Sequence, residues 1–136
     1  MIARGRADFL NVVDSSGWIE VFVGAAGADV FLPVLGERTL LLVPTISITE
    51  VFRWMQREVG TKQAVTAVGV MRGGRVIDLD ESLAVTAAHI GAQHKLPLAD
   101  SIIYATARAH GAVLWTQDAH FEGLPEVRYQ PKQRGG

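Results

Sequence analysis

The sequence predicts an α/β fold, a three-layer sandwich in which helices flank a mostly parallel sheet of four or five strands. Short apolar runs of strand length alternate along the chain with longer segments in which apolar residues recur at helical spacing. The short runs are continuously apolar, as expected for strands that are buried on both faces of a parallel sheet. On these two observations we assign the elements in order.

The first half of the chain predicts two strands, each followed by helices. Residues 9–14 form a Val-rich apolar run, and the Ser15-Ser16-Gly17 that follows is typical of the start of a helix. Residues 18–35 are apolar nearly all round and predict a pair of short helices. A second buried strand is expected at residues 40–43. From Ser47 onward the apolar residues lie on one face of a longer helix.

The second half of the chain continues this alternation, and glycine and proline mark several of the boundaries. In order, we expect a helix at residues 61–72, a strand at 75–79, helices at 81–94 and 98–110, and strands at 112–116 and 127–129. No linker suggests a second domain. Residues 1–136 are therefore expected to form a single domain, with flexible termini at residues 1–8 and 130–136.

The apolar stretch at residues 18–35 carries more hydrophobic area than one core contact requires. Its aromatic residues Trp18, Phe22 and Phe31 are therefore candidates for a surface that binds a partner protein. Deep burial within the same chain explains the pattern equally well.

Composition excludes several classes of function. The chain has no cysteine, which rules out disulfides, thiolate nucleophiles and zinc-thiolate sites. The net charge of -1 gives no global attraction to nucleic acid, although a local Arg cluster could still bind phosphate. The apolar stretch at 21–35 is too short and too interrupted to span a membrane, and the charged residues 1–8 do not resemble a signal peptide. We expect a cytoplasmic protein with no membrane partner.

Four acidic residues stand beside predicted buried strands or in the first turns of predicted helices: Asp14, Glu50, Asp100 and Asp118. Because ligands of parallel sheets bind at the carboxyl ends of the strands, these side chains are expected to converge at one edge. Two carboxylates about 4 Å apart repel by about 4 kcal/mol near a protein surface, so such a group binds protons or a divalent cation. Oxygen-only sites suit Mg²⁺ or Mn²⁺.

Each acid also has a purely structural explanation. Asp14 could cap the helix that begins near Ser15, and Glu50 completes a capping box with Ser47. Asp100 could complement a helix dipole, and Asp118 could begin a turn. Taken together the four acids favour a site, because unrelated caps have no reason to gather at one sheet edge.

The chain resembles PIN domains of the VapC toxin type over residues 9–129. The resemblance rests on Val13-Asp14-Ser15-Ser16, on Glu50 in a helix after a strand, on Leu96-Pro97-Leu98-Ala99-Asp100, and on Leu114-Trp115-Thr116-Gln117-Asp118-Ala119-His120-Phe121. The two C-terminal segments are the most specific of these motifs.

The resemblance implies a Mg²⁺- or Mn²⁺-dependent endoribonuclease toxin that cleaves structured RNA, such as tRNA or rRNA. By position, Asp14, Glu50, Asp100 and Asp118 would be both the catalytic and the metal-binding residues, with Ser16 and Thr116 as supporting hydroxyls. The implied partners are a cognate antitoxin, which blocks the acidic pocket, and a second copy of the toxin.

Two arginines and two other classes of function complete these expectations. Arg53 and Arg57 follow Glu50 on its helix and could contact RNA phosphates, although solvated surface positions are the more common role. One rival is a PIN-fold module that binds a partner without catalysis. A weaker rival is a Mg²⁺-dependent phosphoryl-transfer domain, which should show paired acids after the first strand and a late lysine near Thr116.

Overall fold

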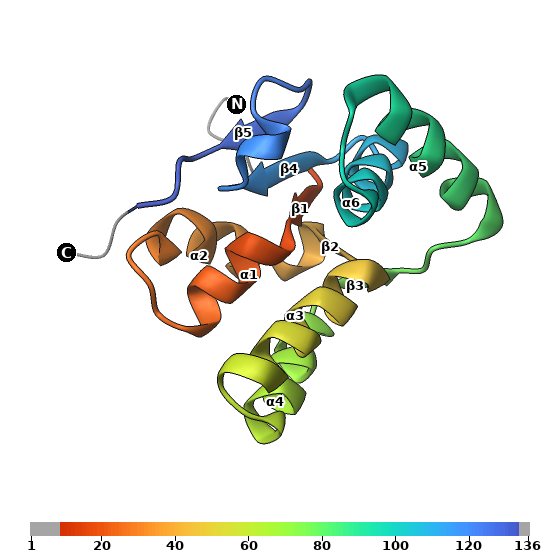
Figure 1. Ribbon diagram of the computed structural model, residues 1–136. Coiled ribbons are helices and arrows are strands. Elements are labelled where there is room, and N and C mark those ends of the chain that lie inside the picture. The colour runs from red at the N-terminus through yellow and green to blue at the C-terminus, as the bar shows by residue number, and fades with distance from the viewer. Residues whose placement is uncertain (1–8, 134–136) are drawn as a thin grey trace.

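A computed structural model of the protein describes residues 9–133, and its centre is a five-stranded sheet (Figure 1). The strands lie in the order β3-β2-β1-β4-β5, and every neighbouring pair is parallel. They are β1 (Asn11–Val13), β2 (Leu41–Pro44), β3 (Arg75–Ile77), β4 (Val113–Thr116) and β5 (Val127–Tyr129). The predicted α/β class and parallel sheet are confirmed.

Helices cover both faces of this sheet (Figure 1). They are α1 (Ser15–Phe22), α2 (Ala28–Gly36), α3 (Thr45–Glu58), α4 (Thr61–Met71), α5 (Glu81–His94) and α6 (Leu98–Ala109), with 3-10 turns at η3 (Arg38–Leu40) and η4 (Ala119–Phe121). Successive residues of β1 face opposite layers, as strand geometry requires. Val12 packs with α6, whereas Val13 packs with α1 to α4.

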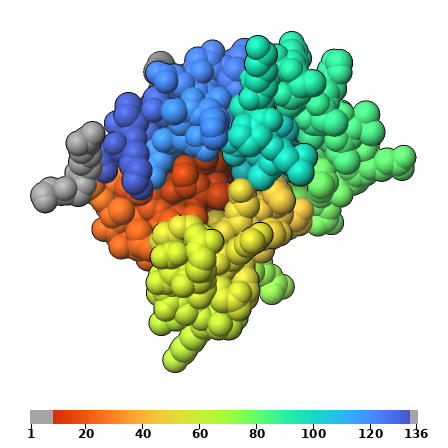
Figure 2. All heavy atoms as spheres, viewed as in Figure 1, coloured from red at the N-terminus to blue at the C-terminus, as the bar shows by residue number. Residues whose placement is uncertain are grey.

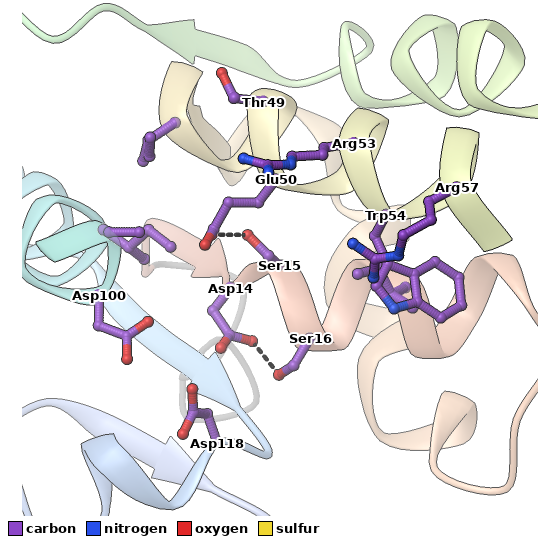
Figure 3. Close-up of a pocket in the computed structure, with 14 residues that line it drawn as sticks. Asp14, Ser15, Ser16, Thr49, Glu50, Arg53, Trp54, Arg57, Asp100 and Asp118 are labelled. Atoms are coloured by element: carbon purple, nitrogen blue, oxygen red, sulfur yellow. Dashed lines mark hydrogen bonds between the residues drawn. The ribbon is translucent and has the colours of Figure 1, made fainter. Parts of the chain in front are cut away.

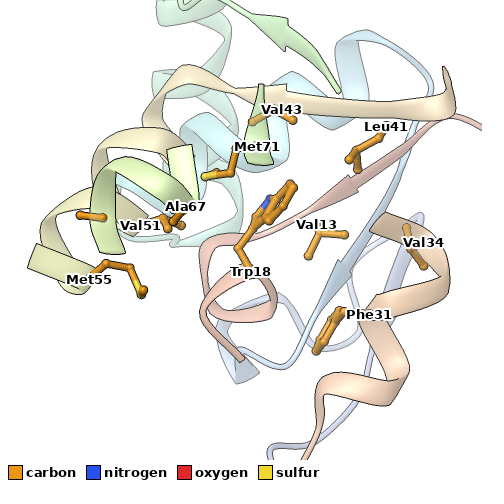
Figure 4. Packing of buried hydrophobic residues seen from close by; sticks show 11 residues of the cluster. Val13, Trp18, Phe31, Val34, Leu41, Val43, Val51, Met55, Ala67 and Met71 are labelled. Atoms are coloured by element: carbon orange, nitrogen blue, oxygen red, sulfur yellow. The ribbon is translucent and has the colours of Figure 1, made fainter. Parts of the chain in front are cut away.

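The aromatic residues of the first two helices belong mainly to the core (Figure 4). Trp18 and Phe31 are each 1% exposed and pack with Val13 of the central strand. The expectation that these two side chains form a partner surface is therefore wrong, and burial within the chain is the correct alternative. Phe22 is only partly buried and stacks on Trp18, with ring centroids 5.6 Å apart.

Several element boundaries differ from those expected. Leu40 belongs to the 3-10 turn η3 and not to β2. The strand β3 ends at Ile77, and its residues are largely exposed because it forms one edge of the sheet. Helix α3 begins at Thr45, directly after the extended Pro44, which is two residues earlier than Ser47. Helices α4, α5 and α6 match the expected ranges within about one residue, whereas the expected helix pair at residues 18–35 begins earlier, with α1 starting at Ser15.

The described part of the C-terminal segment is held by two contacts. The Gln130 backbone N–H donates to the Thr116 carbonyl at 2.9 Å, and Lys132 Nζ donates to Glu20 Oε1 at 3.1 Å. The expectation for residues 1–8 lies outside the described residues. Within residues 9–133, no helix is long and apolar enough to cross a membrane.

Candidate functional site

Asp14, Glu50, Asp100 and Asp118 line one pocket of about 510 Å³. The fold brings them together as expected: Asp14 and Asp118 follow the ends of β1 and β4, and Asp100 lies in the first turn of α6. In Figure 2 the start of the described chain, coloured red, is visible in the middle of one face. It is bordered there by α3, α6 and the C-terminal third of the chain. Figure 3 shows the acidic side chains directed into this space.

Asp14 is both a helix cap and the most buried acid of the pocket. Its carboxylate accepts hydrogen bonds from Ser16 Oγ at 2.7 Å, Gly17 N at 3.1 Å and Thr116 Oγ1 at 2.8 Å. Burial nevertheless raises the pKa of Asp14 to about 7, since these bonds only partly offset the desolvation and Asp118 adds repulsion. The cap and the site roles therefore coincide in one side chain.

Thr116 connects two of the acids. Its hydroxyl donates to Asp14 Oδ2 at 2.8 Å and accepts from the Asp118 backbone N–H at 2.9 Å. Thr116 is fully buried, so its hydroxyl has no water to replace these partners. Ser16 and Thr116, the two supporting hydroxyls expected from the sequence, both contact Asp14.

Asp100 and Asp118 face each other across His120. The ring Nδ1 of His120 lies 2.9 Å from Asp100 Oδ2 and 3.2 Å from Asp118 Oδ1. Burial, and then the charge of Asp118, raise the pKa of Asp100 to about 6, although His120 opposes this shift. The Asp118 charge and the hydrogen bond with Asp100 raise the pKa of His120 above its usual value. These three residues offer ligand atoms within 4.8 Å of one another.

Glu50 is held by the neighbouring helix and not by its own. Ser15 Oγ of α1 donates to Glu50 Oε1 at 2.6 Å. The capping box predicted for Ser47 and Glu50 does not form, because α3 begins before Ser47 and has no side-chain cap. The buried Ser47 hydroxyl has no hydrogen-bond partner within residues 9–133. The structure thus removes the strongest structural explanation for Glu50 and points its carboxylate into the pocket.

Arg53, Trp54 and Arg57 line the same pocket away from the aspartates (Figure 3). Both arginines are exposed. The Nε of Arg57 lies 2.7 Å from Glu58, in a pair so exposed that it contributes little stability. The pocket therefore combines a cluster of carboxylates with cationic side chains one and two helical turns away.

Sequence reasoning missed three residues of this arrangement. His120 shares no metal-ligand spacing with the other histidines, and Trp54 lies on α3 beside the strongest apolar periodicity of the chain. Ser15 resembled only a helix-start residue, but it holds Glu50. The nearness of His120 to Asp118 in the sequence was the one available signal among these three.

The pocket is suited to a divalent cation. Two of its acids have pKa values near or slightly below neutrality because burial and mutual repulsion disfavour their charged forms. A cation among the carboxylates would stabilise their charged forms and so lower both pKa values. Oxygen ligands of this kind are those that Mg²⁺ and Mn²⁺ prefer.

Comparison with known proteins identifies the family of this chain. The family model of the PIN domain matches residues 12–127. The chain belongs to the PIN domain family. The matched range includes all four acidic residues of the pocket. No curated protein sequence gives a significant match.

Solved structures share the PIN fold at low sequence identity. A toxin-antitoxin complex from Klebsiella pneumoniae is 24% identical with a TM-score of 0.73, covering 87% of this chain and 95% of that one. The sarcin-ricin loop cleaving toxin VapC20 of Mycobacterium tuberculosis is 18% identical with a TM-score of 0.73, over 89% and 99%. The DNA-bound VapBC of Salmonella typhimurium is 17% identical with a TM-score of 0.70, over 90% and 98%.

Proposed function

We propose that this PIN domain is an endoribonuclease toxin of the VapC type, which hydrolyses phosphodiester bonds in structured RNA with a divalent cation. The observation that carries the proposal is the convergence of Asp14, Glu50, Asp100 and Asp118, from four separate segments, on one pocket. The presence of arginines in the same pocket supports a polyanionic substrate.

The four acidic side chains would hold Mg²⁺ or Mn²⁺. When bound, such a cation would acidify a water ligand and neutralise charge on the scissile phosphate. The protein positions its own groups for this task through hydroxyl donors: Ser16 and Thr116 orient Asp14, and Ser15 orients Glu50. A carboxylate of the pocket that is not fully neutralised can accept the proton of the attacking water.

Arg53 and Arg57 would bind the phosphates that flank the cleaved bond. Their guanidinium groups are exposed at the wall of the pocket, where a phosphate can approach from solvent. Without them, the acidic residues would repel the RNA backbone. A structural relative described as a toxin that cleaves the sarcin-ricin loop supports structured RNA as the substrate class.

The proposed protein partner is a cognate antitoxin, with a second copy of the toxin in the assembly. Relatives of the same fold occur in toxin-antitoxin complexes, including VapBC complexes that are bound to DNA. In this proposal the antitoxin neutralises the toxin in the cytoplasm, and the toxin becomes active when the antitoxin is removed.

Cleavage of purified total tRNA and rRNA tests the proposal. We expect discrete cuts with Mg²⁺ or Mn²⁺ that disappear in EDTA and with Asp100→Asn. Asp80→Asn is a matched control, because Asp80 caps α5 outside the pocket and Asn caps a helix equally well. Metal binding and antitoxin binding without any cut would favour the alternative of a non-catalytic PIN-fold module.

A further inference from the structure

We propose that Trp54, between Arg53 and Arg57, forms a nucleotide subsite in which an unpaired RNA base stacks on the indole. This inference rests on the proposed ribonuclease function and names the substrate class at the outer part of the pocket. The two guanidinium groups would hold the phosphates on either side of that base.

Trp54 differs from the other tryptophans of the chain. Trp18 is 1% exposed in the core, and the indole N–H of Trp115 donates to Asn11 Oδ1 at 2.8 Å. Trp54 packs against the core cluster on one side and lines the pocket on the other. A tryptophan held in this way offers an aromatic surface to a ligand.

The position of Trp54 on α3 sets its distance from the acidic residues. Glu50, Trp54 and Arg57 lie at successive turns on one side of this helix, and all line the pocket. Four residues of helix advance roughly 6 Å along the axis. A base on Trp54 would therefore lie beside the acidic cluster and not within it. Such a base would belong to a nucleotide next to the cleaved bond.

The chemistry of the surrounding side chains favours RNA over a protein segment. Base and aromatic ring stack without regard to sequence, and arginines supply the phosphate contacts that single strands require. Arg53 and Arg57 are both exposed beside Trp54. A duplex hides its base faces by stacking, so this subsite selects unpaired nucleotides in loops or at ends.

Binding, measured separately from cleavage, tests this subsite. The probe is an unstructured oligoribonucleotide with a central 2-aminopurine, whose fluorescence is quenched when the base stacks. The titration uses full-length protein that carries Asp100→Asn, because this substitution prevents cleavage of the probe. We expect quenching on binding. We also expect that Trp54→Ala weakens binding about 10- to 100-fold, and that Trp54→Phe restores most of it.

Charge variants provide the matched comparison. In the same background, Arg57→Gln should weaken binding and reduce its dependence on salt, whereas Arg108→Gln, on α6 and outside the pocket, should change neither. Thermal unfolding of each variant identifies those that lose binding through loss of structure, and Trp54→Phe keeps the aromatic packing.

The outcomes separate the subsite from the proposed function. If the protein binds the oligoribonucleotide equally well with Trp54 and with Trp54→Ala, and the 2-aminopurine is not quenched, the subsite is overturned. This holds even if the wild-type protein cleaves RNA. Stacking and binding without cleavage by wild type would support the subsite and contradict the nuclease. Loss of binding to a protein partner, with RNA binding unchanged, would show that Trp54 contacts protein and would also overturn the proposal.

Discussion

Gln117 Nε2 donates a hydrogen bond to Glu20 Oε1 at 2.9 Å, which joins α1 to the segment between two residues of the candidate site. Glu20 is 2% exposed and also accepts from Gly27 N at 2.8 Å and from Lys132 Nζ at 3.1 Å. A Cβ at Gly27 would lie 2.8 Å from Glu20 Oε2, so a larger residue there would force this carboxylate to shift. Gln117 lies between Thr116 and Asp118, and the buried contact therefore steadies both.

Replacing Glu20 by Gln should destabilise the protein at neutral pH. Burial raises the pKa of Glu20, but the hydrogen bonds from Gln117, Gly27 and Lys132 outweigh it, so the pKa lies below its usual value. A lowered pKa contributes stability that is present above the unfolded-state pKa and lost as pH falls through the folded-state pKa. Loss of a buried partner costs about 1–3 kcal/mol.

Denaturant unfolding of both proteins from neutral to acidic pH measures this effect. The difference between wild type and Glu20→Gln should be largest near pH 7 and shrink below about pH 4. A difference that does not change with pH would show that the charge of Glu20 contributes nothing.

Asp14→Asn should have the opposite effect on stability. Because the pKa of Asp14 is raised from 3.8 to about 7, the folded protein binds a proton that the unfolded chain releases. The ionised carboxylate therefore reduces stability progressively as pH rises from about 4 to about 7, by an amount on the order of 4 kcal/mol. In buffer with EDTA, Asp14→Asn should be more stable than wild type at pH 8 and lose this advantage near pH 4. Parallel stability curves for the two proteins would refute the buried charge.

Much of the fold and site could be predicted because the signals are local. Continuous apolar strands, the 3.6-residue period of α3 and the position of each acid beside an element are all visible within short segments. Parallel topology then brings the strand-end acids together, since the carboxyl ends of neighbouring strands share an edge.

The features that escaped prediction depend on contacts between distant segments. Glu20 stands alone among apolar residues, and its partners Gln117 and Lys132 lie near the other end of the chain. Trp18 and Phe31 could be assigned to a core or to a surface only once both faces of the sheet were filled. The role of Glu50 was ambiguous because its donor, Ser15, comes from another helix.

Thr116→Val should weaken the site without unfolding the protein. Valine fills the same volume but cannot donate to Asp14 or accept from Asp118 N–H. Loss of a residue that orients a metal-binding side chain typically costs 10- to 100-fold in affinity or activity. Thr116→Ser keeps the hydroxyl and should stay close to wild type. If valine and serine give the same Mn²⁺ affinity as threonine, the hydroxyl does not position Asp14.

The central claim is that the four acidic residues form a divalent-cation site, and calorimetric titration of the purified protein with Mn²⁺ tests it most directly. We predict one saturable binding event near neutral pH that weakens at least about 10-fold in Asp100→Asn and is unchanged in the control Asp80→Asn. Wild-type protein that binds no Mn²⁺, or binds it equally well after Asp100→Asn, would contradict the claim.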